Sequence, residues 1–339
     1  MPIHRAEELT YTAMRNLDMA RAICFQPVSA LEVHGPHLPL GMDVYMARWM
    51  AEETGRRFEA QHADWTVVQL PPLTLGTDEL PLAGSMSASQ RTVYAAVRAH
   101  GRSLARAGYR HIVVTNGHGG PRHASALEAA CRAVSRRHGV HMFTPSIKAL
   151  HAIVTGQRFA AVEARLGRSL SEEEKANLVG GEHAGGWETS FMLAQQPELV
   201  DPMYPQLARQ SPPPVRPIAR AGDALADWRE KRGRSAGQTR EIFQALARGV
   251  GWLLNAHYGY GGPVVTYQGT PSVASAELGH AFRHVMADEC LQIVEDVTSG
   301  RLQGREVRSI ASDPAIIQPH FWSRLGWATA IIVAAMVLL

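Results

Sequence analysis

The most informative stretch of the chain is LEVHGPHLPLGMD, residues 31–43. Glu32 and His34 are two positions apart, so on an extended strand their side chains would point to the same face. The Gly-Pro turn that follows would bring Asp43 back toward that face. Two carboxylates and an imidazole are a ligand set that divalent metals use, and two metals can share one bridging Asp. The alternative is a polar loop in which Asp43 caps a helix.

A second stretch, HIVVTNGHGG at residues 111–120, predicts a strand that ends in a glycine-rich loop. Its β-branched run is typical of a buried strand. Ligands of open α/β sheets bind at the carboxyl ends of the strands, and His118 falls at such an end. A glycine turn with an incidental histidine is the alternative. Apolar residues at helical spacing follow, at Ala124, Leu127, Ala130, Cys131 and Val134.

A third stretch, GEHAGGWETS at residues 181–190, contains three ionisable groups beside small residues. Five positions separate His183 from Glu188, so on one straight helix the two side chains would diverge by about 140°. We therefore expect Glu182 and His183 on a loop, with a helix beginning near Trp187. The alternative is an ordinary acidic helix start, with Glu near the positive end of the helix dipole.

Together these stretches resemble the creatininase (creatinine amidohydrolase) family. The family pattern has a Glu-x-His-Gly-Pro-His-Leu-Pro-Leu-x-x-Asp loop, an Asn-Gly-His loop and a His-Ala-x-x-x-Glu-Thr-Ser segment, and all three occur here in this order. The stretch GTPSVASAELG at 269–279 is similar to the family's C-terminal signature. The resemblance covers residues 15–295. It implies an α/β fold, a three-layer α/β/α sandwich with a mostly parallel central sheet, and a two-metal hydrolase site.

The resemblance also implies a set of metal ligands, with Asp43 as the bridge. Creatininase proper takes a further ligand from a Glu two residues after the loop histidine, where this chain has Gly120. We expect Glu188 to replace it. Pro121 stands where the family usually has Asn, and both differences argue against creatinine as the substrate. The expected ligands are Glu32, His34, Asp43, His118 and Glu188.

We therefore expect two divalent metal ions per chain, with Zn²⁺ preferred and Mn²⁺ or Fe²⁺ as alternatives. Such an ion lowers the pKa of bound water from 15.7 to about 7, and two ions about 3.5–4 Å apart can also polarise a carbonyl. An amide nitrogen must be protonated as it leaves. We expect His183 to carry this proton, with Glu182 orienting it or sharing the transfer. His37 is expected behind the ligands and not among them.

The predicted activity is hydrolysis of a C–N bond of a small molecule by metal-activated water, in an amide, a cyclic amide, a formamide or a peptide. The alternative is a non-catalytic metal-binding or scaffold protein of the same fold, held at a membrane by its C-terminal segment. Gly120 is the only residue that favours this alternative. The resemblance also implies a homo-oligomer.

Composition indicates a globular enzyme. The 339 residues are 45% hydrophobic and 19% charged, which is enough apolar content for a large core. The net charge is only +3, and no basic run is interleaved with aromatic residues, so we expect no nucleic-acid partner. Three widely spaced cysteines form no CxxC motif, which suits a reducing, cytoplasmic compartment. The polar start of the chain does not resemble a signal peptide.

We expect one hydrolase domain over residues 1–300 and a connector over 301–320. Residues 325–339 carry no charge, and the hydrophobic segment 321–339 would span about 28 Å as a helix, close to the hydrocarbon thickness of a bilayer. It is therefore either a membrane anchor or a helix buried between subunits. We expect strands at 24–32, 66–70, 111–115 and 140–147; helices at 44–60, 89–107, 158–177, 223–254 and 274–299; a closing loop at 75–87; and an exposed connector at 210–217.

Overall fold

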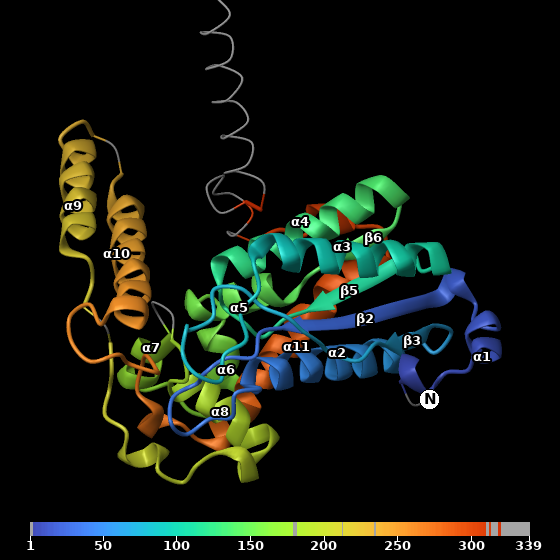
Figure 1. The fold of residues 1–339 in the computed structure, drawn as a ribbon, viewed down its shortest axis with the longest axis horizontal. Helices are drawn as coiled ribbons and strands as arrows, with labels where there is room; N and C mark the ends of the chain where they lie inside the picture. The colour runs from blue at the N-terminus through green and yellow to red at the C-terminus, as the bar shows by residue number, and fades with distance from the viewer. Residues whose placement is uncertain are drawn as a thin grey trace, which may run out of the picture.

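In the computed structural model, a parallel β-sheet forms the centre of the folded protein (Figure 1). The structure describes residues 3–178, 182–211, 213–233, 235–309, 312 and 318–319. In sheet order its strands are β1 (His4–Arg5), β3 (Thr66–Gln69), β2 (Ala22–Ser29), β5 (His111–Thr115) and β6 (His141–Phe143), and β4 (Leu73–Thr74) pairs with the end of β2. Every pairing is parallel, as expected.

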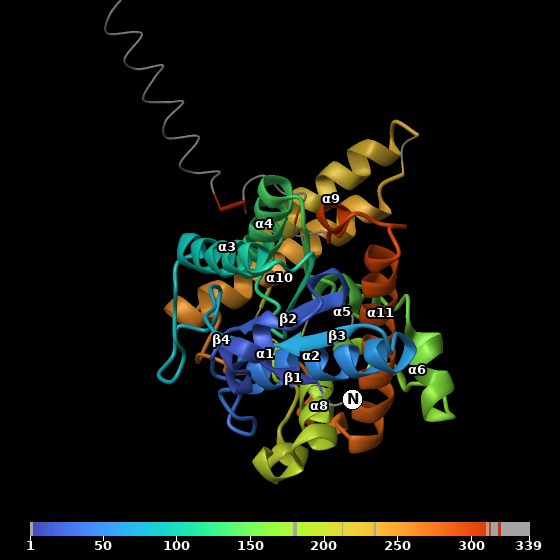
Figure 2. The ribbon, with the colours of Figure 1, turned by 90° about the vertical axis from the view of Figure 1, so that its right-hand side faces the viewer.

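Alternating side chains of β2 contact two different layers of helices, one on each face of the sheet. Cys24 lies in one apolar cluster with residues of α3 and α4, whereas Phe25 lies in another with residues of α2 and α11. Side chains of a strand point alternately to the two faces of its sheet, so each face is covered by its own pair of helices (Figure 2). The predicted α/β/α sandwich is confirmed. These helices are α2 (Met42–Gln61), α3 (Gln90–Ala107), α4 (Pro121–His138) and α11 (Ala276–Thr298).

A third apolar cluster lies beyond the carboxyl ends of the strands and includes α8 (Gly186–Gln195). There α8 crosses α11 with the backbones in contact, because a side chain on Gly279 would collide with the carbonyl oxygen of Ser190. Trp187 packs on Phe282 at the same crossing. The crossing fixes the position of α8. The neighbouring helices are α5 (Ser146–Val154), α6 (Phe159–Leu166) and α7 (Glu172–Leu178).

Residues 216–258 form a helical hairpin that stands out from the body (Figure 1). A single helix over 223–254 was expected, and this was wrong. The chain turns at Gly233, whose positive φ of 66° suits glycine, so α9 (Arg216–Glu230) ends and α10 (Gly237–Tyr258) runs back beside it.

Other boundaries also differ from the prediction. The strand expected at 140–147 is only three residues long, because α5 begins directly after Pro145. The helix expected at 158–177 is broken into α6 and α7 at Gly167, which has a φ of 70°. The shorter elements are α1 (Tyr11–Arg15) and 3₁₀ turns at Ala6–Glu8, Met19–Arg21, Pro197–Leu199, Tyr204–Gln206, Pro271–Val273 and Gly304–Glu306.

After α11 the chain returns to the sheet layer. Val307 is buried, and the amide of Ser309 donates a 2.9 Å hydrogen bond to Glu128 of α4. Within the described ranges, no helix is long and apolar enough to cross a membrane. The segment 321–339, which we considered as an anchor, lies outside the described residues.

Candidate metal centre

Three predicted ligands meet where β2 and β5 end. The ring nitrogen Nδ1 of His118 lies 2.7 Å from Oε1 of Glu32 and 3.1 Å from Oδ2 of Asp43. His118 follows β5, and Asp43 lies in the first turn of α2. Glu32 was expected on the strand, but β2 ends at Ser29, so Glu32 extends from a loop. All three side chains are buried, which places an acidic, metal-binding group beneath the surface.

A second group forms on the other oxygen of Asp43. Nε2 of His34 lies 3.3 Å from Oδ1 of Asp43 and 3.6 Å from Oε2 of Glu188, which is in the first turn of α8. Burial raises the pKa of Glu188 to about 7, although the charge of His34 opposes this. Asp43 therefore faces one imidazole with each of its oxygens, as a bridging carboxylate would.

Backbone carbonyls fix the orientation of three imidazoles around these carboxylates. His118 donates from Nε2 to the carbonyl of Thr77 at 3.0 Å, and His34 donates from Nδ1 to the carbonyl of Glu32 at 3.1 Å. His183 donates from Nε2 to the carbonyl of Val33 at 2.6 Å. The other ring nitrogen of each histidine faces a carboxylate: Nδ1 of His118 and of His183 face Glu32, and Nε2 of His34 faces Asp43. Metal-binding histidines are oriented by such partners, which also select the tautomer.

The charges of the cluster shift the pKa values of its members. Burial alone would lower the pKa of His34, but nearby carboxylates, chiefly Asp43, raise it to about 10. Burial likewise opposes protonation of His118, yet Glu32 and Asp43 hold its pKa well above the usual value. Burial would raise the pKa of Asp43, but His34 and His118 hold it well below its usual range. A metal that binds here must therefore displace protons from two imidazoles.

The predicted catalytic pair is not arranged as expected. Nδ1 of His183 lies 4.0 Å from Glu32, so its free nitrogen does face the cluster. Glu182, however, makes no hydrogen bond or ion pair with His183. Its carboxylate accepts from the amides of Glu188 at 2.6 Å and Trp187 at 3.1 Å, so it caps the start of α8. Burial lowers the pKa of His183 to about 4, with the charge of His34 acting in the same direction, so the ring is neutral at pH 7.

Local backbone geometry holds these loops together. Asn116 accepts from the amide of His118 and the hydroxyl of Ser29 through Oδ1, and donates from Nδ2 to the His118 carbonyl. The β5 loop is thereby tied to the end of β2. On the other side, Ala184 has a φ of 51° and donates its amide to Glu188 at 2.6 Å. Left-handed backbone at a residue other than glycine is costly, and such residues cluster at functional sites.

The glycine at position 120 is enforced by the 75–87 loop. A Cβ on Gly120 would lie 2.5 Å from Nε2 of His118 and 2.7 Å from Cβ of Asp78. The space in which a carboxylate could extend from this position is occupied by the loop, whose Leu80 amide also donates to Glu32 at 3.0 Å. As expected, this loop therefore closes on the site.

Three further residues complete the surroundings. His37 shares a 2.8 Å hydrogen bond with the hydroxyl of Thr189 and lies outside the three candidate ligand sets. Two others were missed from the sequence. His123 is fully buried edge-on against His118, with ring centroids 5.2 Å apart, and Trp252 of α10 lies 5.6 Å from His183. Neither belongs to a motif, and Trp252 comes from the helix pair whose turn was not predicted.

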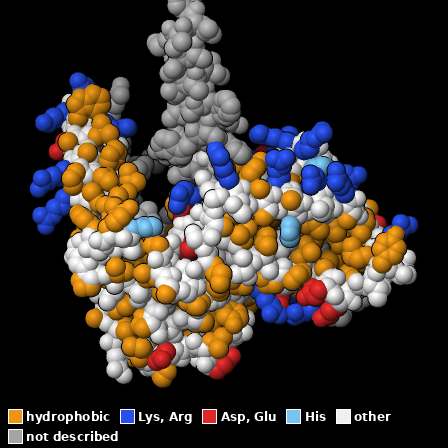
Figure 3. Space-filling model, viewed as in Figure 1, with side chains coloured by type: hydrophobic (Ala, Val, Ile, Leu, Met, Phe, Trp, Pro, Cys, Tyr) orange, Lys and Arg blue, Asp and Glu red, His pale blue; other side chains and the backbone are white. Residues whose placement is uncertain are grey.

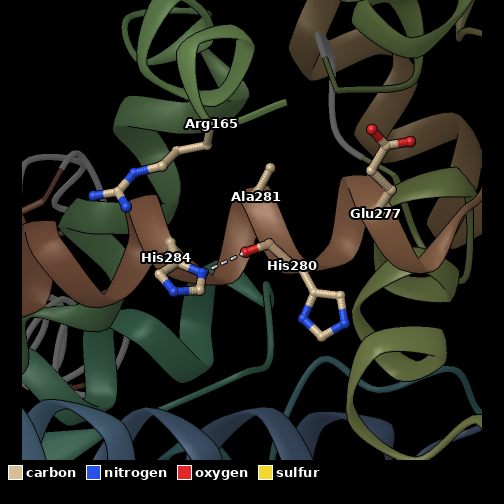
Figure 4. Close-up of a pocket in the computed structure, with 5 residues that line it drawn as sticks. All are labelled: Arg165, Glu277, His280, Ala281 and His284. Atoms are coloured by element: carbon tan, nitrogen blue, oxygen red, sulfur yellow. Dashed lines mark hydrogen bonds between the residues drawn. The ribbon is translucent and has the colours of Figure 1, made fainter. Parts of the chain in front are cut away.

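A cavity of about 550 Å³ lies elsewhere, over α11 and α6 (Figure 4). It is lined by Glu277, His280, His284, Ala281 and Arg165. The only hydrogen bond drawn there runs from Nδ1 of His284 to the carbonyl of His280, one turn back along the helix. The charged side chains do not converge on a point, so we assign no site to this cavity.

The described residues contain three sets whose ligand atoms all lie within 4.8 Å of one another. Two of them share Asp43, and Nε2 of His34 is buried without a hydrogen-bond partner. Imidazole and carboxylate donors in this arrangement fit two borderline divalent ions such as zinc or manganese. The sets are Glu32–Asp43–His118, His34–Asp43–Glu188 and Glu32–His34–His183.

Comparisons with solved structures give the same fold. A crystal structure of creatinine amidohydrolase (creatininase) matches with a TM-score of 0.57 and 19% identity, over 87% of this chain and 98% of that one. Structures described as a manganese creatininase and as a mutant creatininase of the Zn-Zn type match with TM-scores of 0.55 and 18% identity over the same shares.

Two characterised relatives share the name mycofactocin precursor peptide peptidase. The one from Mycolicibacterium smegmatis is 36% identical over 106 residues, which cover 31% of this chain and 41% of that protein. The one from Mycobacterium ulcerans is 26% identical over 216 residues, 58% of this chain and 73% of that protein. The first alignment thus spans less than half of the relative's length. A sequence profile described as creatinine amidohydrolase matches residues 7–294, and the chain belongs to the creatininase family of hydrolases.

Proposed function

We propose that this protein is an amidohydrolase with two divalent metal ions, and that it cleaves a C–N bond in a small molecule or short peptide. The sharing of Asp43 between two ligand sets is the observation that carries this proposal. Glu32 and His118 would complete one metal position, and His34 and Glu188 the other. Zn²⁺ and Mn²⁺ are the ions to test first, because structurally similar creatininases are described with them.

Backbone groups also hold three of the proposed ligands in place. When bound, the ions would supply an activated water and an electrophile for the carbonyl. The backbone acceptors of His34 and His118 orient the opposite ring nitrogens toward the carboxylates, and the Ala184 amide holds Glu188 in place. Burial excludes bulk water and strengthens every electrostatic contact in the cluster. The site therefore needs little rearrangement before it can act.

His183 is the residue that we assign to proton transfer. Its Nε2 is committed to the Val33 carbonyl, so Nδ1 is the nitrogen that can accept a proton and return it to the departing amine. The low pKa of the buried ring keeps it neutral at pH 7, so Nδ1 carries no proton before the reaction. Glu182 acts through the turn that it caps and not on the imidazole. We propose it as a positioning residue for Glu188.

The substrate would enter beside α8 and α10. His183 and Glu188 are each about one-seventh exposed, whereas the other ligands are almost fully covered. Trp252 contacts His183 on this side and would contribute an aromatic wall. Because two relatives are named as peptidases of a precursor peptide, short peptides are the first substrates to test, before cyclic amides and formamides.

The test starts from metal-free protein. Chelator-treated protein would be reconstituted with Zn²⁺ or Mn²⁺ and assayed for release of free amine from peptide, lactam and formamide panels. We expect no activity before reconstitution and activity on one panel at about two metals per chain. A protein that binds no metal after reconstitution would contradict the proposal and favour the scaffold alternative.

A further inference from the structure

The outer side of α3 and α4 carries far more positive charge than the rest of the chain. Residues 90–138 contain nine arginines and a single acidic residue, Glu128, which is buried. The whole chain has a net charge of only +3, so the remainder is net acidic. We call the arginines of this segment the arginine face. They are Arg91, Arg98, Arg102, Arg106, Arg110, Arg122, Arg132, Arg136 and Arg137.

The arginine face is largely unpaired. In the part of the chain that the structure describes, only Arg122 and Arg132 have a carboxylate within ion-pair distance. Arg98, Arg102 and Arg106 repeat every four positions, so they lie on one stripe of α3, and all three are exposed. Figure 3 shows this positive charge along the upper edge of the molecule, over α3 and α4. None of the nine arginines belongs to the ligand sets of the candidate metal centre.

The last described part of the chain lies against the same layer. Ser309 and Ser312 both donate to Glu128 of α4, and Arg305 and Arg308 lie just before them in the chain. Burial lowers the pKa of Arg132, and the charge of Arg308 acts in the same direction. The last segment that the structure describes therefore lies against α4, and the sequence 325–339 that comes later in the chain carries no charge.

A third feature lies on this side. Figures 1 and 2 share their vertical axis, and in both the free end of the α9–α10 hairpin lies toward the top of the view, on the side where α4 lies. Near this end Trp228 is 47% exposed and stacks under the guanidinium of Arg232, 4.0 Å from the ring centroid. Lys231 is exposed beside it. Exposed tryptophan among basic residues is typical of a lipid–water interface.

We propose that the arginine face, together with the hairpin tip at Trp228, docks on a membrane that contains anionic lipid headgroups. Unpaired arginines on two adjacent helices match a layer of phosphate groups, and each adds to the attraction. The exposed tryptophan and the apolar sequence that follows the Ser309 contact suit the lipid phase. A nucleic-acid backbone would use the arginines but would leave both apolar features without a partner. This proposal is independent of the hydrolase activity.

The test measures how the full-length protein sediments with phosphatidylcholine vesicles, with and without phosphatidylglycerol. The triple variant Arg98→Gln, Arg102→Gln, Arg106→Gln should bind the anionic vesicles on the order of 100-fold more weakly than wild type, because each arginine contributes to membrane affinity. The matched control is Arg48→Gln, Arg56→Gln, Arg165→Gln, which removes the same charge from α2 and α6 and should bind as wild type does. Unchanged thermal unfolding of both variants shows that they are folded.

The apolar sequence is present in every one of these proteins, so its own affinity for lipid cancels in the comparison. Equal binding of wild type to neutral and anionic vesicles would overturn the proposal, as would a triple variant that binds like the control. Preference for a duplex RNA or DNA oligonucleotide over anionic vesicles, lost in the triple variant, would also overturn it and assign the face to nucleic acid.

Discussion

The two halves of the ligand cluster share Asp43 but are held in different ways. Glu32 and His118 follow adjacent parallel strands, and the Nδ1 of His118 lies within 3.1 Å of both carboxylates. His34 and Glu188 are further apart, at 3.6 Å, and Glu188 comes from α8, far along the chain. The first half is therefore fixed by the sheet, whereas the second depends on how α8 packs against α11.

This difference coincides with the chain's departure from the family pattern. Creatininase proper carries a carboxylate two residues after the loop histidine, where this chain has Gly120, enclosed by the 75–87 loop. Glu188, from another layer, faces His34 and belongs to the His34–Asp43–Glu188 set. A ligand on a separately packed helix can be altered with less effect on the rest of the site. We therefore expect the second metal position to be the weaker and the more variable of the two.

Loss of the shared residue should have the largest effect. Asp43→Ala removes a ligand from both halves and leaves His34 without its main carboxylate partner, so we expect hydrolysis to fall to background. The measurement is amine release under saturating metal. Substantial activity in this variant would show that the two halves do not depend on a common bridge.

The proton-transfer residue should come next. His183→Ala should lower kcat by about 10²–10⁴-fold, the usual contribution of a general acid–base group, while both metals remain bound. His284→Ala, an exposed histidine on α11, is the matched control and should behave as wild type. If His183→Ala also loses a metal, the residue is a ligand, which the Glu32–His34–His183 set would permit.

Loss of Glu188 should reduce activity less than loss of the shared residue Asp43. Glu188→Ala should lower activity at limiting metal by at least the 10–100-fold that removal of an outer partner costs. Excess metal should restore part of this activity, because the first half is intact. Glu277→Ala, on the remote surface of α11, serves as the control. An equal loss in Glu188→Ala and Asp43→Ala would remove the distinction between the halves.

A carboxylate at position 120 should not rescue the second half. Gly120→Glu would push its Cβ into His118 and Asp78, so we expect it to lower the free energy of unfolding by about 1–3 kcal/mol. Gly119→Glu is the matched control, since a Cβ there meets no other atom within 4 Å. Both would be measured by denaturant unfolding. A stable Gly120→Glu that restores activity to Glu188→Ala would show that the loop moves aside.

The smallest expected effect is on the pH dependence of stability, through His111 at the start of β5. Burial lowers the pKa of His111 to about 4, where its ring stacks on His141 with centroids 5.2 Å apart. The unfolded chain takes up this proton near pH 6.5, so the free energy of unfolding should fall as the pH drops from 6.5 to 4. After allowance for partial exposure, this amounts to about 2 kcal/mol.

His111→Phe keeps the ring packing and removes the titrating group, so its stability should vary less over this pH window than that of wild type. Urea unfolding of the metal-free proteins at several pH values would measure the difference. Parallel pH profiles for the two proteins would contradict the assignment.

The sequence was sufficient to predict that the proposed ligands lie together, because their order reflects the topology. Parallel strands end at one edge of the sheet, so the residues after β2 and β5 had to lie together. Glu188 was expected from the family resemblance, as the replacement for the carboxylate missing at Gly120, and it lies 3.6 Å from His34. The role of Glu182 could not be predicted, because carboxylates that cap helices and carboxylates that orient imidazoles look alike in sequence.

The arginine face was also not predictable from composition. Its arginines are separated by apolar and small residues, and only the helical phase of α3 places every fourth one on a common stripe. The hairpin turn at Gly233 was missed for a related reason. Helical periodicity continues on both sides of it, and a single glycine is tolerated within many helices.

The most direct test of the two-metal account is the metal content of three proteins after dialysis. We expect about two metal ions per chain in wild type, about one in Glu188→Ala and none in Asp43→Ala, measured by elemental mass spectrometry with protein concentration from absorbance. Two ions retained in Asp43→Ala, or a single ion in fully reconstituted wild type, would contradict the shared bridge on which the account depends.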